Sequence, residues 1–187
     1  MGMPAEARRR WTAHEVAEMQ REDCAFPRFE LVDGDLLVTQ APTPRHQSIA
    51  AALFVRIYDY VNLSGRASAL MSPADIRLDS DTTVQPDIFV YPRESEPIGD
   101  WSSIRSLLLA VEVLSPSTQR QDRTIKRAFY QRHGVSEYWI VDAEAEQIER
   151  WLPDSSLPSI HDSRLEWQPA FADVALVIDV ANLFHRR

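Results

Sequence analysis

The stretch "LLLAVEVLSPSTQRQDRTIKRAFYQRHG", residues 107–134, determines the fold. Its first eight residues are apolar apart from one glutamate, a pattern typical of a strand buried on both faces. Residues 118–133 have helical spacing, and Gly134 ends the helix. A further apolar segment follows at 137–142. The order strand, helix, strand predicts a right-handed crossover and an α/β fold whose central mixed sheet is flanked by helices.

The elements around this core are predicted from capping, turn and periodicity signals. Thr12 and Glu15 form a capping box, and Asp33-Gly34 between two apolar runs indicates a hairpin. The predicted elements are a helix over 12–20, a hairpin over 29–38, a helix over 43–63 that stops at Gly65, strands over 67–72, 74–79, 87–92 and 147–152, a loop over 153–164, and a terminal helix capped by Asp179.

Length and composition indicate a globular protein. With 187 residues, we expect one domain over 11–187 and a disordered N-terminus over 1–10. The single cysteine, Cys24, excludes an internal disulfide and suits a reducing cytoplasm. No apolar run approaches the ~20 residues of a membrane span, so no membrane partner is expected.

The net charge of -8 excludes only one mode of nucleic-acid binding. It argues against a broad basic face that coats nucleic acid, but an enzyme whose carboxylates hold a metal adds negative charge itself. Other chemistries lack their motifs. The five glycines form no phosphate-binding loop, the five histidines share no paired spacing, and no G-x-S-x-G elbow occurs.

Two acidic residues are candidates for a metal site. Glu112 stands inside the apolar run, where a carboxylate is costly to bury without a compensating partner. The sequence allows three interpretations of Glu112. It pairs with an arginine, it points outward from an edge strand, or it serves as a metal ligand or catalytic acid or base. Asp87 follows Pro86 at the start of a strand, and Pro-Asp by itself is also a turn signal. Two carboxylates on separate strands that converge are enough for Mg²⁺ or Mn²⁺.

Lys126 is the only lysine in a chain with 19 arginines. It is either half of an exposed pair with Asp122, four residues earlier, or it reaches back toward Glu112. An ammonium is a compact charge, whereas a guanidinium is suited to bidentate contacts, so the choice of lysine favours the second interpretation. Four arginines make this helix basic, which indicates either a solvated face or a phosphate-facing patch: Arg120, Arg123, Arg127 and Arg132.

Five ordered motifs resemble a known family. "FELVDGDL", "VQPDIFV", "LAVEVLSPST", "DRTIKRAFY" and "VSEYWIVD" are similar to those of the large bacterial Uma-type endonuclease family, formerly a domain of unknown function. That family belongs to the restriction-endonuclease-like PD-(D/E)xK superfamily. The resemblance covers roughly residues 12–185 and implies a restriction-endonuclease-like core.

The resemblance also implies roles for individual residues. Asp87 and Glu112 map onto the superfamily's two acidic positions and would bind Mg²⁺ or Mn²⁺, with the backbone carbonyl of Val113 as a further ligand. The superfamily pattern places a lysine two residues after the second acid, where this chain has Leu114. The lysine of this family stands instead on the following helix, as Lys126 does.

Three supporting residues match recurrent family positions or lie beside the lysine. Glu30 would be a further ligand of metal or water, or a surface charge. His46 would approach the phosphate, or would make a structural hydrogen bond at a helix terminus. Asp122 would orient Lys126.

The functional hypothesis is a metal-dependent endonuclease that hydrolyses phosphodiester bonds in DNA. Catalysis is assigned to Asp87, Glu112 and Lys126, and a homodimer would provide the two sites that cutting two strands requires. One alternative is a nuclease-like fold used as a binding or assembly module without turnover. Another is a metal-dependent hydrolase of small phosphate esters.

Overall fold

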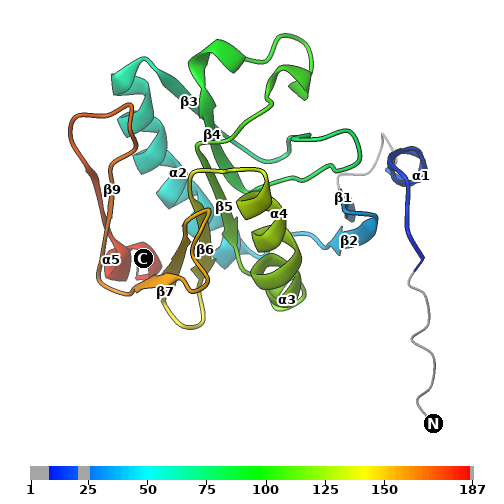
Figure 1. Ribbon diagram of the computed structural model, residues 1–187. Coiled ribbons are helices and arrows are strands. Elements are labelled where there is room, and N and C mark those ends of the chain that lie inside the picture. The colour runs from blue at the N-terminus through cyan, green and yellow to red at the C-terminus, as the bar shows by residue number, and fades with distance from the viewer. Residues whose placement is uncertain (1–8, 21–25, 186–187) are drawn as a thin grey trace.

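The computed structural model describes residues 9–20 and 26–185. Its centre is a six-stranded sheet in the order β3-β4-β5-β6-β7-β8 (Figure 1). Only β5 and β6 are parallel, and every other neighbouring pair is antiparallel, so the sheet is mixed as predicted. The strands are β3 (Ala67–Met71), β4 (Ile88–Pro92), β5 (Leu109–Val113), β6 (Tyr138–Asp142), β7 (Gln147–Trp151) and β8 (Ser159–His161).

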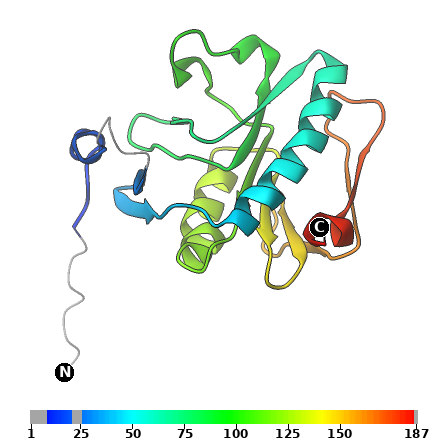
Figure 2. The same cartoon turned by 180° about the vertical axis from the view of Figure 1, so that it is seen from behind.

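Helices cover both faces of this sheet. The long helix α2 (Pro44–Ser64) lies across one face, as Figure 2 shows, and Gly65 ends it in the left-handed conformation at φ 65°. The other face carries the crossover between β5 and β6. That crossover is one continuous helical segment made of α3 (Gln119–Gln121), the π-helical turn η3 (Asp122–Lys126) and α4 (Arg127–Arg132). The predicted helix is therefore confirmed, but its π-helical turn was not foreseen.

The sheet has a hydrophobic core on each of its two faces, because the side chains along its strands alternate between them. Successive side chains of a strand point to opposite faces, so Leu109, Val111 and Val113 of β5 pack toward α2. Ala110 packs toward the crossover helix, where Phe129 and Tyr130 of α4 meet it. Glu112 shares that second face because it lies two residues from Ala110. The strand is buried on both sides, as the apolar run indicated.

The N-terminal hairpin lies beside the sheet rather than in it. β1 (Arg28–Val32) and β2 (Asp35–Thr39) pair antiparallel around Asp33 and Gly34, whose φ values of 51° and 80° are those of a type I′ turn. Before it, α1 (Ala13–Met19) begins at Thr12 with the predicted capping box. The backbone N–H of Leu31 donates to Thr83, which ties the hairpin to the segment before β4.

The segment 74–79 does not form the predicted strand. Only Ile76 pairs there, through two backbone hydrogen bonds with Val84. The predicted strand rested on the alternation that the buried residues Ala74 and Ile76 produce. Both side chains do pack into the core beside the crossover helix, but they do so from a loop that leads to β4. Between β4 and β5 the chain forms two short 3₁₀-helical turns, η1 (Arg93–Ser95) and η2 (Trp101–Ser103).

The prediction of a loop over 153–164 is wrong for its second half. β8 forms the sheet edge there, and β9 (Arg164–Trp167) then pairs with β10 (Leu176–Asp179). These strands are three or four residues long. Ser159 and Ile160 of β8 are exposed, and the alternation of polar and apolar residues along β9 covers only four residues, which is too short a run to predict a strand. The terminal helix α5 (Val180–Phe184) begins as predicted at Asp179, whose side chain accepts from the Asn182 amide.

The expected disorder of residues 1–10 falls mostly outside the described residues. Within the described part, Arg9 pairs with Glu15 at 2.8 Å, and Arg10 donates to the carbonyl of Asp33 at 2.5 Å. No helix among residues 9–20 and 26–185 is long and apolar enough to cross a membrane.

Candidate active site

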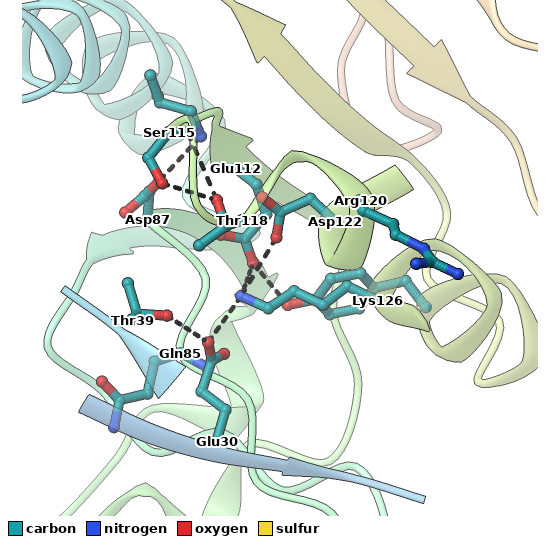
Figure 3. A network of polar contacts seen from close by, with 12 residues as sticks. Glu30, Thr39, Gln85, Asp87, Glu112, Ser115, Thr118, Arg120, Asp122 and Lys126 are labelled. Atoms are coloured by element: carbon teal, nitrogen blue, oxygen red, sulfur yellow. Dashed lines mark hydrogen bonds and ion pairs between the residues drawn. The ribbon is translucent and has the colours of Figure 1, made fainter. Parts of the chain in front are cut away.

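The crossover helix brings Lys126 to Glu112. The Nζ atom of Lys126 lies 2.8 Å from Oε1 of Glu112 and 2.9 Å from Oε2 of Glu30. Asp122 is also within reach, with Oδ1 3.8 Å from the same nitrogen. In Figure 3 the ammonium lies between Glu30 of β1 and Glu112 of β5. Lys126 therefore points at the carboxylates, not at solvent, and its side chain is only 6% exposed.

The π-helical turn sets both Asp122 and Lys126 inside. The amide of Arg127 donates to the carbonyl of Asp122, five residues earlier, and this carbonyl also accepts from the Tyr138 hydroxyl. Such turns are rare and are frequent at functional sites. Tyr130, one turn further on, donates to Oε1 of Glu112 at 3.3 Å. The helix thus supplies three polar side chains to one buried point.

Asp87 reaches the same region from the neighbouring strand. Ile88 of β4 is paired with Val111 of β5, so continuing the antiparallel register by one residue places Asp87 opposite Glu112. The Oδ2 atom of Asp87 accepts from the backbone N–H of Val113 at 2.8 Å and lies 3.1 Å from Nε2 of His46. Asp87, one residue before β4, and Glu112 of β5 are therefore neighbours and face one region.

Glu30 is a buried member of the cluster, not a surface charge. Glu30 is 2% exposed, and its Oε1 atom accepts a hydrogen bond from the backbone N–H of Gln85 at 2.6 Å. Thr39, which lies on the partner strand of the hairpin, donates to Oε2 at 3.4 Å. The position of the hairpin beside the sheet is what brings this third acid to Lys126.

His46 lies in the first turn of α2 and faces Asp87. Burial by itself lowers the pKa of the His46 imidazole, but the hydrogen bond and charge of Asp87 outweigh it, and the carbonyl of Val113 adds to them. The pKa of His46 is therefore raised. The Nδ1 atom is buried and has no hydrogen-bond partner among the described residues.

A cavity of about 220 Å³ opens onto this cluster. Its lining comes from the hairpin, from the N-terminal turn of α2, from the ends of β4 and β5, and from the loop that begins the crossover. The residues predicted to carry function all line it: Glu30, His46, Asp87, Glu112, Val113, Asp122 and Lys126. Side chains far apart in the sequence therefore share one concave surface.

The cluster holds more acidic groups than basic ones, and burial raises the pKa of Glu112 well above its usual value although the charge of Lys126 opposes the shift. Four carboxylates face one ammonium and one imidazole. Burial raises the pKa of Asp122 to about 6, and the nearby carboxylates Glu30 and Asp87 add to the effect, although Lys126 opposes it. Burial lowers the pKa of Lys126, but the charges of Glu112, Glu30 and Asp122 outweigh it and raise that pKa well above its usual value. Lys126 is thus held as a cation.

The donor set fits a hard divalent cation. Carboxylate and carbonyl oxygens are the preferred ligands of Mg²⁺ and Mn²⁺, and a bound cation would favour the ionised form of the buried acids. Each of Asp87 and Glu112 keeps one oxygen that makes no hydrogen bond to another described residue. No three histidine, cysteine, aspartate or glutamate side chains within the described ranges are grouped closely enough to enclose a metal. A Mg²⁺ site typically needs only one or two carboxylates with water.

The basic helix does not form a phosphate-facing patch. Arg123 pairs with Asp142 and Glu149 at the far side of the helix, and Arg132 pairs with Asp33. Arg127 stacks over the ring of Trp151. Arg120 is exposed, and its guanidinium points away from the carboxylates in Figure 3. Three of the four arginines thus attach the helix to its surroundings.

Several polar residues of the site were missed by sequence reasoning. Gln85 and Thr39 hold Glu30, and Tyr130 holds Glu112. Arg28 lines the cavity, two residues before Glu30 on β1. The shared helical face of Asp122, Lys126 and Tyr130 was a usable signal for the tyrosine. Gln85 stands in the motif "VQPDIFV", two residues before Asp87, but no local pattern showed that it would bind Glu30 or that Arg28 would line the cavity, because the hairpin reaches the site only through tertiary packing.

Comparison with known proteins agrees with this architecture. A family model described as "Uma2: Putative restriction endonuclease" matches residues 15–181. The fold is similar to the crystal structure of "a putative nuclease belonging to DUF820" from Anabaena variabilis ATCC 29413. The two chains are 20% identical, with a TM-score of 0.74 and coverage of 93% of this chain and 97% of that one. No curated protein matches. Because the family model spans most of the sequence, the chain belongs to the Uma2 family of putative restriction endonucleases.

Proposed function

We propose that the protein is a divalent-metal-dependent endonuclease that hydrolyses phosphodiester bonds in DNA. One observation carries the proposal. Asp87 just before β4, Glu112 of the adjacent strand β5 and the buried ammonium of Lys126 face a single cavity, where acidic groups outnumber basic ones in the cluster. Membership of the Uma2 family supports a nuclease, and the acidic, oxygen-rich lining supports a metal cofactor.

Each side chain has a distinct part in this proposal. Asp87 and Glu112, with the carbonyl of Val113, would hold Mg²⁺ or Mn²⁺. When bound, such an ion polarises a phosphate and lowers the pKa of a water ligand. His46 and the Val113 amide orient Asp87. Lys126, kept protonated by Glu112 and Glu30, would stabilise negative charge that develops on the phosphate oxygens rather than abstract a proton. Asp122 helps to position the ammonium.

Metal binding tests the site directly. Titration of Mn²⁺ by calorimetry should show binding to the wild type and a loss of at least tenfold in affinity for Asp87→Ala and for Glu112→Ala. The matched control is Asp162→Asn, which changes an exposed aspartate outside the cavity. Equal affinity in the wild type and both alanine variants would rule out the assigned ligands.

Cleavage tests the reaction separately. Plasmid, single-stranded and branched DNA are incubated with Mn²⁺ and either the wild type or Lys126→Ala. We expect the wild type to cut at least one substrate and Lys126→Ala to lose cleavage while it still binds metal. A wild type that binds Mn²⁺ but cuts none of the three substrates would favour the alternative of a binding or assembly module without turnover.

The assembly and the location are part of the same proposal. Two copies acting together would supply one site for each strand of a duplex. The mass of the protein in solution, measured by light scattering with and without DNA, tests for that homodimer. A cytoplasmic location fits a chain with one cysteine, which can form no internal disulfide.

A further inference from the structure

One cation that lines the cavity takes no part in the carboxylate cluster. Arg28 lies on β1 and is half-buried, and its guanidinium makes no hydrogen bond or ion pair with any residue of the described ranges. Lys126, by contrast, lies within 2.9 Å of two carboxylates. The charge of Lys126 is therefore already balanced inside the protein, whereas the charge of Arg28 is available to a ligand.

The hairpin directs Arg28 toward the same side as Glu30. Residues two apart on a strand point to one face, about 6.6–6.8 Å from each other along the chain. Thr39 stands opposite Arg28 in the register and reaches Glu30, so all three side chains belong to the face that borders the cavity. A ligand at the carboxylate cluster would thus extend past Arg28 if it is longer than a single phosphate.

Phe26 holds the guanidinium without using its hydrogen-bond donors. The Cζ atom of Arg28 lies 4.6 Å from the centroid of the Phe26 ring, which also lines the cavity. A cation–π contact uses the face of the guanidinium, and the five N–H donors lie in its plane. These donors remain available for the bidentate contact that arginine makes with a phosphate.

The size and apolar part of the cavity restrict which nucleic acid can enter. At about 220 Å³ it is smaller than the pockets that hold drug-sized ligands, so it admits part of one strand and not a duplex. Its lining includes Phe26, Pro42, Met71 and Pro116. Aromatic and apolar side chains beside an arginine suit an unpaired nucleotide, whose base is free to stack.

We propose that Arg28, held in place by Phe26, binds a phosphate neighbouring the scissile one in single-stranded or locally unpaired DNA. The inference rests on the proposed function and adds the substrate class to it. Arg28 is the substrate-binding residue, and Phe26 is a positioning residue that acts through it.

Binding of a labelled single-stranded oligonucleotide, measured by fluorescence anisotropy with a chelator present, tests the inference without any need for catalysis. Arg28→Ala should weaken binding about tenfold, the loss expected for charge-assisted hydrogen bonds. It should also reduce the slope of log affinity against log salt by about 0.7, since one phosphate contact is lost. Arg28→Lys should keep the slope but bind more weakly. Arg105→Ala, which removes an exposed arginine outside the cavity, is the control and should match the wild type.

In the same experiment, substitutions of Phe26 should affect binding differently from substitutions of Arg28. Phe26→Leu should weaken binding with the salt slope unchanged, and Phe26→Tyr should restore the affinity, because only the aromatic face supports the guanidinium. Duplex DNA of the same sequence should bind more weakly than the single strand to the wild type, and Arg28→Ala should reduce this preference.

The outcomes separate this inference from the nuclease assignment. If Arg28→Ala and Arg105→Ala bind the single strand alike, or if the wild type binds no single strand, the inference is wrong even if DNA is cleaved in Mn²⁺. If binding depends on Arg28 and no substrate is cleaved, the inference stands and the nuclease assignment fails. With activity present, Arg28→Lys should raise KM several-fold and change kcat less, since it acts on binding.

Discussion

Lys126 shows why one residue of this arginine-rich chain is a lysine. Its ammonium fills a small buried space between Glu30 and Glu112, with Asp122 at 3.8 Å. A compact charge with three donors can face carboxylates from three directions, whereas a planar guanidinium needs a wider, fork-shaped site. The residue that looked unusual in the sequence is therefore the cation that three of the buried acids share.

Removing this charge should destabilise the fold. Lys126→Met leaves the buried carboxylates of Glu30 and Glu112 without their cation, and breaking such a buried pair typically costs about 3–5 kcal/mol. Urea unfolding at neutral pH measures the free energy of unfolding. The double variant Lys126→Met/Glu112→Gln should recover part of the loss, because one uncompensated charge is then absent. If the double variant is no more stable than the single one, the carboxylates do not set the cost.

At the scale of elements, Arg123 attaches the crossover helix to two strands of the central sheet. Arg123 donates to Asp142 at 2.6 Å and to Glu149 at 2.7 Å, so the π-helical turn is tied to β6 and β7. Asp142 also accepts from the backbone amides of Glu144 and Ala145, both at 3.0 Å. The same aspartate thus orders the turn between two strands and holds the helix that carries Lys126.

This arrangement predicts a pH dependence of stability. Burial alone raises the pKa of Asp142, but the Ala145 amide, Arg123 and the Glu144 amide outweigh it, so the pKa lies below its usual 3.8. Because the folded-state pKa is lower than the unfolded one, the stabilisation is fully present well above pH 3.8 and is lost as the pH falls from there through the folded-state pKa.

Asp142→Asn should therefore cost about 1.5–3 kcal/mol at pH 7, the typical contribution of hydrogen bonds to a charged group. The difference from the wild type should shrink at pH 3. Urea unfolding at the two pH values measures both quantities. Asp154→Asn, at an exposed aspartate that makes no polar contact with another described residue, should match the wild type at pH 7. A difference for Asp142→Asn that stays constant between pH 7 and pH 3 would contradict the linkage.

At the scale of the whole molecule, the sequence predicted what local patterns encode. The apolar run of β5, the capped helices and the Asp33-Gly34 turn are each determined by neighbouring residues, and all three predictions are confirmed. The cavity depends on how the hairpin docks against the sheet, so Gln85, Thr39 and Arg28 could not be placed. The roles of Asp87, Glu112 and Lys126 stay predictions, although the structure does bring the three side chains to one cavity.

The C-terminal strands were also missed, yet they complete one of the two cores. Trp167 of β9 is fully buried and packs edge-on against Trp139 of β6, with ring centroids 5.6 Å apart. Its backbone carbonyl accepts from the hydroxyl of Tyr60 on α2. The segment therefore covers the face of the sheet that lies away from Lys126 and the crossover helix, and its strands, each only three or four residues long, are held by tertiary contacts that so short a sequence pattern does not reveal.

A change in the segment of β9 and β10 should therefore alter the free energy of unfolding without altering the metal affinity of the site. Trp167→Ala removes a large buried ring and should lower the free energy of unfolding by about 3–5 kcal/mol, because the surrounding side chains cannot fill the cavity. Val174→Ala, at a side chain that is 75% exposed, is the matched control and should change it by less than about 0.5 kcal/mol. Mn²⁺ affinity, measured by calorimetry at a temperature where Trp167→Ala remains folded, should equal that of the wild type, since the aromatic residues that contact the Trp167 ring (Tyr60, Trp139 and Phe171) do not line the cavity. A loss of metal affinity that accompanies the loss of stability would show instead that the two faces of the sheet are coupled.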